Sequence, residues 1–175
     1  MLAEFIAELR ATTDDPAFSV KDSFAALDLT EAGLDLLFEA SWIRRAAREP
    51  GPDKRLEWRA IENADDLSAW EAAWGQTPDG AEPIFTPQLL AEPRTVVAAG
   101  FDVDGVIRAG GIGHDAAGVV GLSNLFGDWR HAANGVAGLL PGRELVGYEF
   151  RDDLKAAKSN GFSEAGPLRV WVSPA

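Results

Sequence analysis

The chain has 175 residues, of which 46% are hydrophobic and six are tryptophan, and its formal net charge is −12. This composition can form the core of a folded domain and excludes general disorder. Because the sequence contains no cysteine, it also excludes disulfides, thiolate metal ligands and a cysteine nucleophile.

The negative charge is concentrated in one part of the chain. Residues 1–128 contain 10 Lys/Arg and 23 Asp/Glu, a net charge of −13, whereas residues 129–175 have a net charge of +1. Nucleic acids and anionic membranes require clustered basic side chains, so neither is expected as a partner. The opening residues lack the basic start and unbroken apolar run of a signal peptide, and no stretch is apolar enough to span a bilayer. A cytoplasmic protein is therefore expected.

In chain order, the first fifty residues predict a helix and a β-hairpin. Apolar residues recur at helical spacing within residues 2–9. Residues 23–29 and 34–45 fit two strands around a Thr-Glu-Ala-Gly turn, although a helix that begins at Thr30 is also compatible. The segment REPGPDK indicates a linker. We therefore divide the chain into an N-terminal extension, residues 1–50, and a domain, residues 55–175.

Strand and helix signals alternate after the linker. A strand is expected at residues 56–61, and then a helix that Asn63 caps and Gly75 ends. A short helix is expected near residues 86–92, and Asp104-Gly105 fits the turn of a hairpin. The remaining expected elements are strands at residues 95–101, 106–113, 118–126, 144–149 and 166–172, and helices near residues 129–140 and 151–162.

This order of elements resembles the GNAT superfamily of acyl-CoA-dependent N-acyltransferases. The segments GVVGLSNLF and NGF…GPLRVWV are similar to the fourth strand and the closing helix–strand pair of that family. The resemblance implies an α/β (α+β) fold, with a mixed, mostly antiparallel sheet flanked by helices. The predicted N-terminal helix and hairpin lie outside the family's usual core and are appended to it. It also implies acetyl-CoA or another acyl-CoA as the cofactor, and a small-molecule or protein amine of unknown identity as the acceptor. The appended hairpin is a candidate homodimer contact.

The family holds the cofactor's diphosphate with the pattern Gln/Arg-x-x-Gly-x-Gly/Ala after its fourth strand. Arg130, Ala133 and Gly135 lie at the matching positions, and Asn134 lies between the last two. The resemblance therefore implies that these four residues face the phosphates. Alanine replaces the first glycine, which makes this loop degenerate, because backbone must approach a phosphate closely.

The same segment also predicts an ordinary helix. Asp128 can cap it, and the apolar residues between Trp129 and Leu140 recur at helical spacing. In such a helix the amides of residues 133–135 bond within the helix, and Asp128 occupies the position at which an anion would bind.

The remaining site residues also follow from the resemblance. In the family the thioester binds where the fourth and fifth strands separate, which corresponds to Leu122 and Ser123. The tyrosine that often acts as the acid is replaced by Ala157, so Tyr148, the only tyrosine in the chain, is the candidate acid. Glu149 is the candidate base for the incoming amine. Asp152 and Asp153 complete this acidic cluster.

Two classes of function are compatible with these residues. One is an acyl-CoA-dependent N-acyltransferase, which the retained Arg130 favours. The other is a non-catalytic GNAT-like domain that binds a small ligand or a protein, which the degenerate loop and Ala157 favour. His114 and His131 lack partners at metal-ligand spacing, so no metal site is expected.

Overall fold

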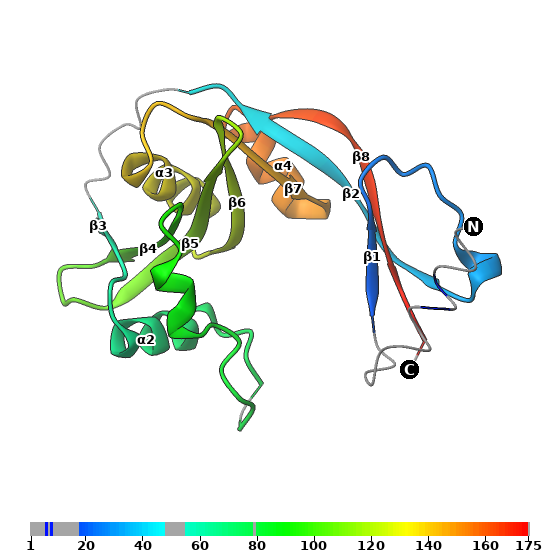
Figure 1. Ribbon diagram of the computed structural model, residues 1–175. Coiled ribbons are helices and arrows are strands. Elements are labelled where there is room, and N and C mark those ends of the chain that lie inside the picture. The colour runs from blue at the N-terminus through cyan, green and yellow to red at the C-terminus, as the bar shows by residue number, and fades with distance from the viewer. Residues whose placement is uncertain (1–5, 7, 9–17, 48–54, 79, 175) are drawn as a thin grey trace.

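The computed structural model describes residues 6, 8, 18–47, 55–78 and 80–174. These residues form an eight-stranded sheet in the order β1-β8-β2-β7-β6-β5-β4-β3 (Figure 1). The strands are β1 (Ser19–Asp22), β2 (Asp35–Arg45), β3 (Glu57–Ala60), β4 (Thr95–Phe101), β5 (Ile107–Ala116), β6 (Val119–Phe126), β7 (Glu144–Glu149) and β8 (Ser163–Val172). The helices are α2 (Ala64–Trp74), α3 (Trp129–Leu139) and α4 (Arg151–Ser159), and two short 3-10 helices are η1 (Thr30–Ala32) and η2 (Pro87–Ala91).

The predicted fold class is confirmed. Neighbouring strands of the sheet are antiparallel, except that β6 and β7 are parallel. The caps predicted for α2 also form: the Asn63 side chain accepts the Asp66 N–H over 2.9 Å, and Gly75 ends the helix with a φ of 69°. Residues 86–92 form a 3-10 helix, η2, and Asp102 and Gly105 form the predicted turn between β4 and β5.

The predicted N-terminal β-hairpin is wrong. Its second strand exists as β2, but residues 23–29 form no strand. The Asp22 carboxylate accepts the backbone N–H groups of Phe24 over 3.2 Å and Leu27 over 2.8 Å, so the chain turns after β1 instead of extending. β1 and β2 consequently pair with opposite edges of β8.

The predicted N-terminal extension therefore shares a sheet with the predicted domain. β2 lies between β7 and β8 and pairs with both. The boundary at residues 50–55 stays a prediction. Most of the predicted first helix lies outside the described residues. Within it, Ile6 and Glu8 are helical, and Ile6 is buried beside Leu29 and Trp171.

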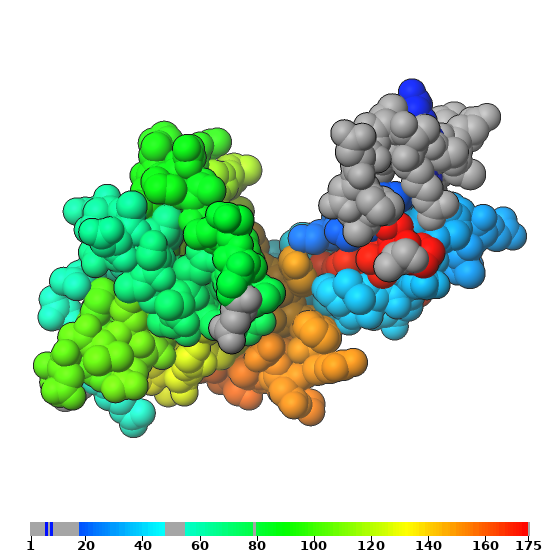
Figure 2. Space-filling view, turned by 90° about the horizontal axis from the view of Figure 1, so that it is seen from below, coloured from blue at the N-terminus to red at the C-terminus, as the bar shows by residue number. Residues whose placement is uncertain are grey.

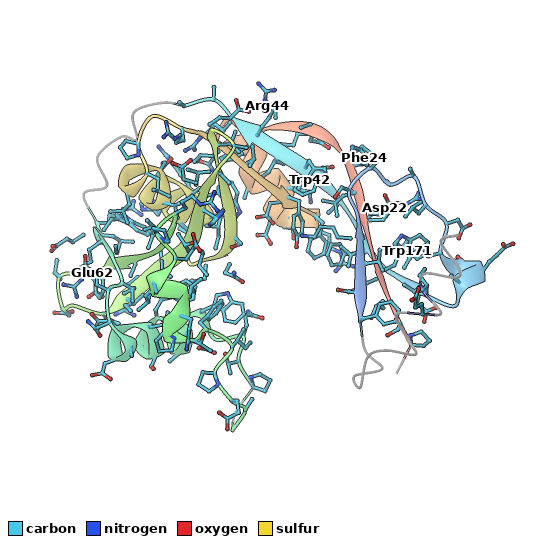
Figure 3. All side chains as sticks on the ribbon, viewed as in Figure 1. Asp22, Phe24, Trp42, Arg44, Glu62 and Trp171 are labelled. Atoms are coloured by element: carbon cyan, nitrogen blue, oxygen red, sulfur yellow. The ribbon has the colours of Figure 1, made fainter. Side chains whose placement is uncertain are left out.

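The sheet consists of two arms that diverge between β6 and β7 (Figure 1). One arm contains β3–β6 with α2 and α3, and the other contains β7, β2, β8 and β1. The space-filling view shows a groove between the two masses (Figure 2). Figure 3 shows Asp22 and Trp171 far out in the second arm, with Trp42 nearer to β7. None of the described helices is long and apolar enough to cross a bilayer.

The two large helices of the first arm pack on opposite faces of the sheet. Successive residues of a strand point to opposite faces. Along β4, Ala98 packs in the cluster that contains α3, whereas Val97 and Ala99 pack in the cluster that contains α2. Trp70 of α2 is fully buried and donates its indole N–H to the Ala98 carbonyl over 2.9 Å. Both helices thereby hold the β6 side of the groove in place.

Candidate functional site

β6 and β7 pair over a short distance and then separate. Val119, Val120 and Gly121 pair with Glu144, Leu145 and Val146, and the described ladder contains no later pair. From Leu122 onward, the β6 edge that faces β7 has no strand partner among the described residues. Backbone N–H and C=O groups on this edge are therefore available to a ligand.

A bulge lies near the end of β6, just beyond its last pair with β7. Ile112 of β5 pairs with Ser123, but Gly110 pairs with Phe126, so β6 has one extra residue in this interval. Asn124, inside the bulge, has a φ of 51°, a left-handed conformation that asparagine tolerates better than most residues. A bulge bends its strand and increases the local twist. Sequence reasoning missed Asn124, and the available signal was a polar residue within an apolar strand.

A cavity of about 470 Å³ occupies the separation. Its lining residues come from β6, β7 and the end of α2: Trp74, Gln76, Leu122, Ser123, Asn124, Leu125, Phe126, Tyr148 and Glu149. The structure thus brings together Leu122, Ser123, Tyr148 and Glu149, all predicted as site residues. Trp74 and Gln76 are not among the site residues that the sequence predicts.

Glu149 is the carboxylate of the acidic cluster that reaches the cavity. The pKa of Glu149 is raised, chiefly because the carboxyl group is partly buried and also because the Asp153 charge lies nearby. The Trp129 indole donates a hydrogen bond of 3.1 Å to Oε1, which lowers the pKa but does not cancel the rise. Asp152 and Asp153 are exposed, and Asp152 accepts a hydrogen bond from Lys155 over 2.8 Å. A half-buried carboxylate with a raised pKa is suited to accept a proton near neutral pH.

Tyr148 lies between the cavity and the N-terminal strands. It pairs with Trp42 of β2, whose ring contacts the tyrosine ring edge to face at 5.7 Å, and Lys21 Nζ lies 4.2 Å from the tyrosine centroid. No described residue forms a hydrogen bond with the Tyr148 hydroxyl, so the hydroxyl is available to a ligand. Ala157, at the family's usual acid position, is fully buried in α4.

The segment after β6 forms the ordinary helix. The Asp128 side chain caps α3 by accepting the His131 N–H over 3.1 Å. Arg130 is exposed in the first turn, and its amide and that of Trp129 belong to the part of a helix that lacks backbone partners. No cluster of His, Asp or Glu suited to a metal occurs among the described residues.

Ala133, Asn134 and Gly135 lie inside α3, beyond its first turn. Ala133 and Gly135 are buried, and a Cβ at Gly135 would overlap the Trp58 ring. The glycine is thus explained by helix–sheet packing. Asn134 Oδ1 is buried and has no hydrogen-bond partner among the described residues.

The two ends of an acyl-CoA fit this site unequally. The free edge of β6 at Leu122 and Ser123, beside a cavity, suits an acyl thioester. The amides of residues 133–135 are within the helix and do not form a phosphate cradle, and Asp128 adds a negative charge at the helix start. In this segment, Arg130 and the amides of the first turn are the remaining groups that could contact a diphosphate.

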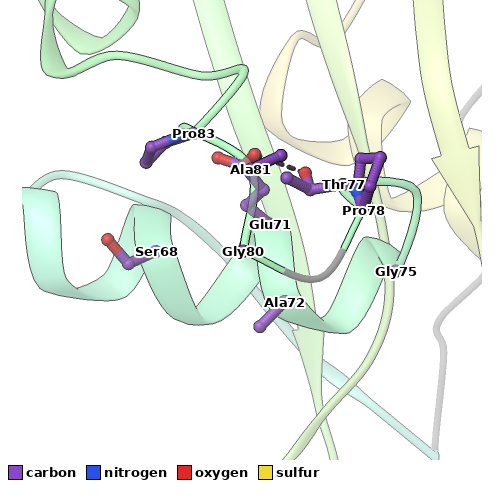
Figure 4. Close-up of a pocket in the computed structure, with 9 residues that line it drawn as sticks. All are labelled: Ser68, Glu71, Ala72, Gly75, Thr77, Pro78, Gly80, Ala81 and Pro83. Atoms are coloured by element: carbon purple, nitrogen blue, oxygen red, sulfur yellow. Dashed lines mark hydrogen bonds between the residues drawn. The ribbon is translucent and has the colours of Figure 1, made fainter.

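A second hollow, of about 410 Å³, borders the loop after α2 (Figure 4). Glu71 accepts hydrogen bonds there from Thr77 Oγ1 over 2.5 Å, the Ile84 N–H over 2.8 Å and the Phe85 N–H over 3.3 Å. Burial raises the pKa of Glu71, but these bonds outweigh burial and leave it below its ordinary value. Glu71 therefore anchors the loop whose first residues include Gln76, beside the β6–β7 cavity.

No family model matches the chain, and no curated protein matches it. A GCN5-related N-acetyltransferase from Kribbella flavida is similar at 15% identity and a TM-score of 0.57, and the match covers 84% of this chain and 62% of that chain. A GCN5-related N-acetyltransferase from Sphaerobacter thermophilus is similar at 12% identity and a TM-score of 0.61, with coverages of 95% and 63%. A functionally unknown conserved protein from Staphylococcus epidermidis is similar at 7% identity and a TM-score of 0.64, with coverages of 97% and 77%. The chain spans less than two thirds of the first two. This likeness and the parallel β6–β7 pair show that the chain has the fold of the GCN5-related N-acetyltransferases, a GNAT-like domain.

Proposed function

We propose that the chain is an N-acyltransferase that transfers an acyl group from a thioester to an amine in the cavity between β6 and β7. The observation that carries this proposal is the separation of the two parallel strands after Gly121 and Val146. It leaves the edge of β6 unpaired next to a half-buried carboxylate, Glu149, and an unbonded phenol, Tyr148.

Each group has a defined role in this proposal. An acyl-CoA supplies an activated carbonyl. The β6 backbone at Leu122 and Ser123 orients the acyl oxygen. Glu149 takes a proton from the ammonium group, and Tyr148 gives a proton to the sulfur. One C–N bond forms and one C–S bond breaks; the second proton that the nitrogen loses restores the tyrosine hydroxyl.

Titration with acetyl-CoA, followed by a turnover assay with a panel of amines, tests the proposal. At about 100 times its dissociation constant the ligand should stabilise the fold by about 2.7 kcal/mol, which a thermal shift detects. Glu149→Gln and Tyr148→Phe should lower turnover and leave acetyl-CoA binding intact. Absence of both binding and turnover in the wild-type protein would overturn the proposal.

Asp128 favours a second candidate, a non-catalytic domain that binds a small ligand or a protein, because its charge opposes a diphosphate at the start of α3. Asp128→Asn removes the charge and retains a good helix cap. If the start of α3 holds the diphosphate, this variant should bind acetyl-CoA more tightly and Arg130→Ala more weakly. If the wild type and both variants fail to bind it, the second candidate is supported.

A further inference from the structure

The lining of the β6–β7 cavity has an unbalanced charge. Glu149 is the one lining residue of the described chain that has a carboxyl group. The polar groups that accompany it, Ser123, Asn124 and Gln76, are neutral, and two of the remaining lining residues are the aromatic residues Trp74 and Phe126. No Lys or Arg in the described ranges lines this cavity. The cavity therefore lacks a group that could neutralise an anion.

Charges behind the lining reinforce this asymmetry. Asp153 acts on Glu149 and raises its pKa, and Asp128 caps the neighbouring helix. A cation, Lys21, lies next to one lining residue, with its Nζ 4.2 Å from the Tyr148 ring centroid. Lys21 is exposed and is not a lining residue. Its position illustrates that the face of Tyr148 attracts an ammonium group.

We propose that the acceptor bound in this cavity is a small organic cation that carries no carboxylate. An ammonium group gains from the Glu149 charge and from the Trp74 and Tyr148 rings. An amino acid also carries a negatively charged carboxylate, and no described guanidinium or ammonium group lines the cavity to bind it. The net charge of −12 also raises the local concentration of cations. The role of this cation as an acceptor rests on the proposed function, but its binding does not.

Calorimetric titration without any acyl donor tests the inference. Phenethylamine is compared with phenylalanine, and cadaverine with lysine, because the members of each pair differ by one carboxylate. At least one amine should bind about tenfold more tightly than its carboxylated partner, and its affinity should fall as salt is added. Equal affinities within both pairs, or no binding by either amine, would overturn the inference.

Two variants assign the effect to Glu149. Glu149→Gln retains an acceptor for the Trp129 indole and removes the charge, so the preference for the amine should shrink about tenfold. Asp152→Asn is the matched control, because it removes one exposed charge outside the cavity and should change amine affinity little. An unchanged preference in Glu149→Gln would contradict the inference. Amine binding by a wild-type protein that neither binds nor turns over acetyl-CoA would instead refute the acyltransferase proposal alone.

Discussion

Trp129, the first residue of α3, donates its indole N–H to the Glu149 carboxylate at the end of β7 over 3.1 Å. The bond spans the gap between the two arms of the sheet, because α3 packs on the first arm and β7 belongs to the second (Figure 1). The Trp129 ring also contacts Phe162 edge to face at 5.0 Å. This tryptophan therefore orients the candidate base and partly offsets the effect of burial on its pKa.

Replacement of Trp129 by Phe removes this donor and keeps an aromatic ring. The pKa of Glu149 should rise further, because the indole hydrogen bond is a factor that lowers it. The acidic limb of the kcat/KM pH profile should then move to higher pH, and ¹³C NMR of the carboxyl group reports the pKa directly. Trp42→Phe is the control, because the Trp42 indole donates to the Ser23 carbonyl instead. The same Glu149 pKa in Trp129→Phe and wild type would contradict this role.

Replacement of Glu149 by Gln should stabilise the fold at neutral pH. The raised pKa of Glu149 means that the folded state binds its proton more readily than the unfolded state. Stability is therefore lost as the pH rises from the ordinary Glu pKa through the folded value, and Gln avoids this loss. Thermal melting should show a higher Tm for Glu149→Gln at pH 7 and a smaller difference in acid.

Glu164 provides a control of opposite sign. Lys158 and Ser41 hydrogen-bond its carboxylate and lower its pKa, so Glu164→Gln should lower the Tm at pH 7. Equal shifts in the two variants would mean that the pKa of Glu149 does not affect stability.

Gly135→Ala should destabilise the protein by about 1–3 kcal/mol, because the new Cβ meets the Trp58 ring. Denaturant unfolding measures the change. Gly138, an exposed residue of the same helix, is the matched control, and its replacement by Ala should be neutral or slightly stabilising. Trp58→Leu should reduce the cost of Gly135→Ala in a double mutant. Equal tolerance at both glycines would show that Trp58 imposes no constraint.

Glu71→Gln should loosen the loop that contains Thr77, Ile84 and Phe85, whose groups donate to this carboxylate. The variant replaces one accepting oxygen by an amide group, and it should cost about 2–3 kcal/mol and increase proteolysis of this loop. Because the pKa of Glu71 is lowered, its contribution to stability is present above the ordinary Glu pKa and is lost as the pH falls through the lowered value. Glu82→Gln, an exposed change in the same loop, should be silent. Wild-type loop proteolysis in Glu71→Gln would contradict this anchor.

Local signals in the sequence predicted local structure well. Asn63, Gly75 and Asp128 act within one helical turn, so their capping roles follow from the residues beside them. The strands at the site followed from hydrophobic patterns and turn signals, and Tyr148 and Glu149 were named from the resemblance to the GNAT superfamily. Whether this site transfers acyl groups stays a prediction.

Features that depend on distant segments were not predictable in the same way. The placement of β2 beside β8 depends on residues 163–172, and no local pattern in residues 34–45 identifies that partner. The bulge at Asn124 depends on its register with β5, and the position of Trp74 at the cavity depends on how α2 packs. These contacts decide which side chains meet in the candidate site.

The pairing of β2 with β8 also has a consequence for how the chain folds. Ala40 pairs with Leu168, so the second arm joins residues that are far apart in the sequence, and β1 depends on the same late strand. On the ribosome, the first arm has its strands and helices in sequence, but β2 must wait for its first partner, β7, and β1 must wait until residues 163–172 are made. During this interval, the apolar residues of β2 are exposed to chaperones and to self-association.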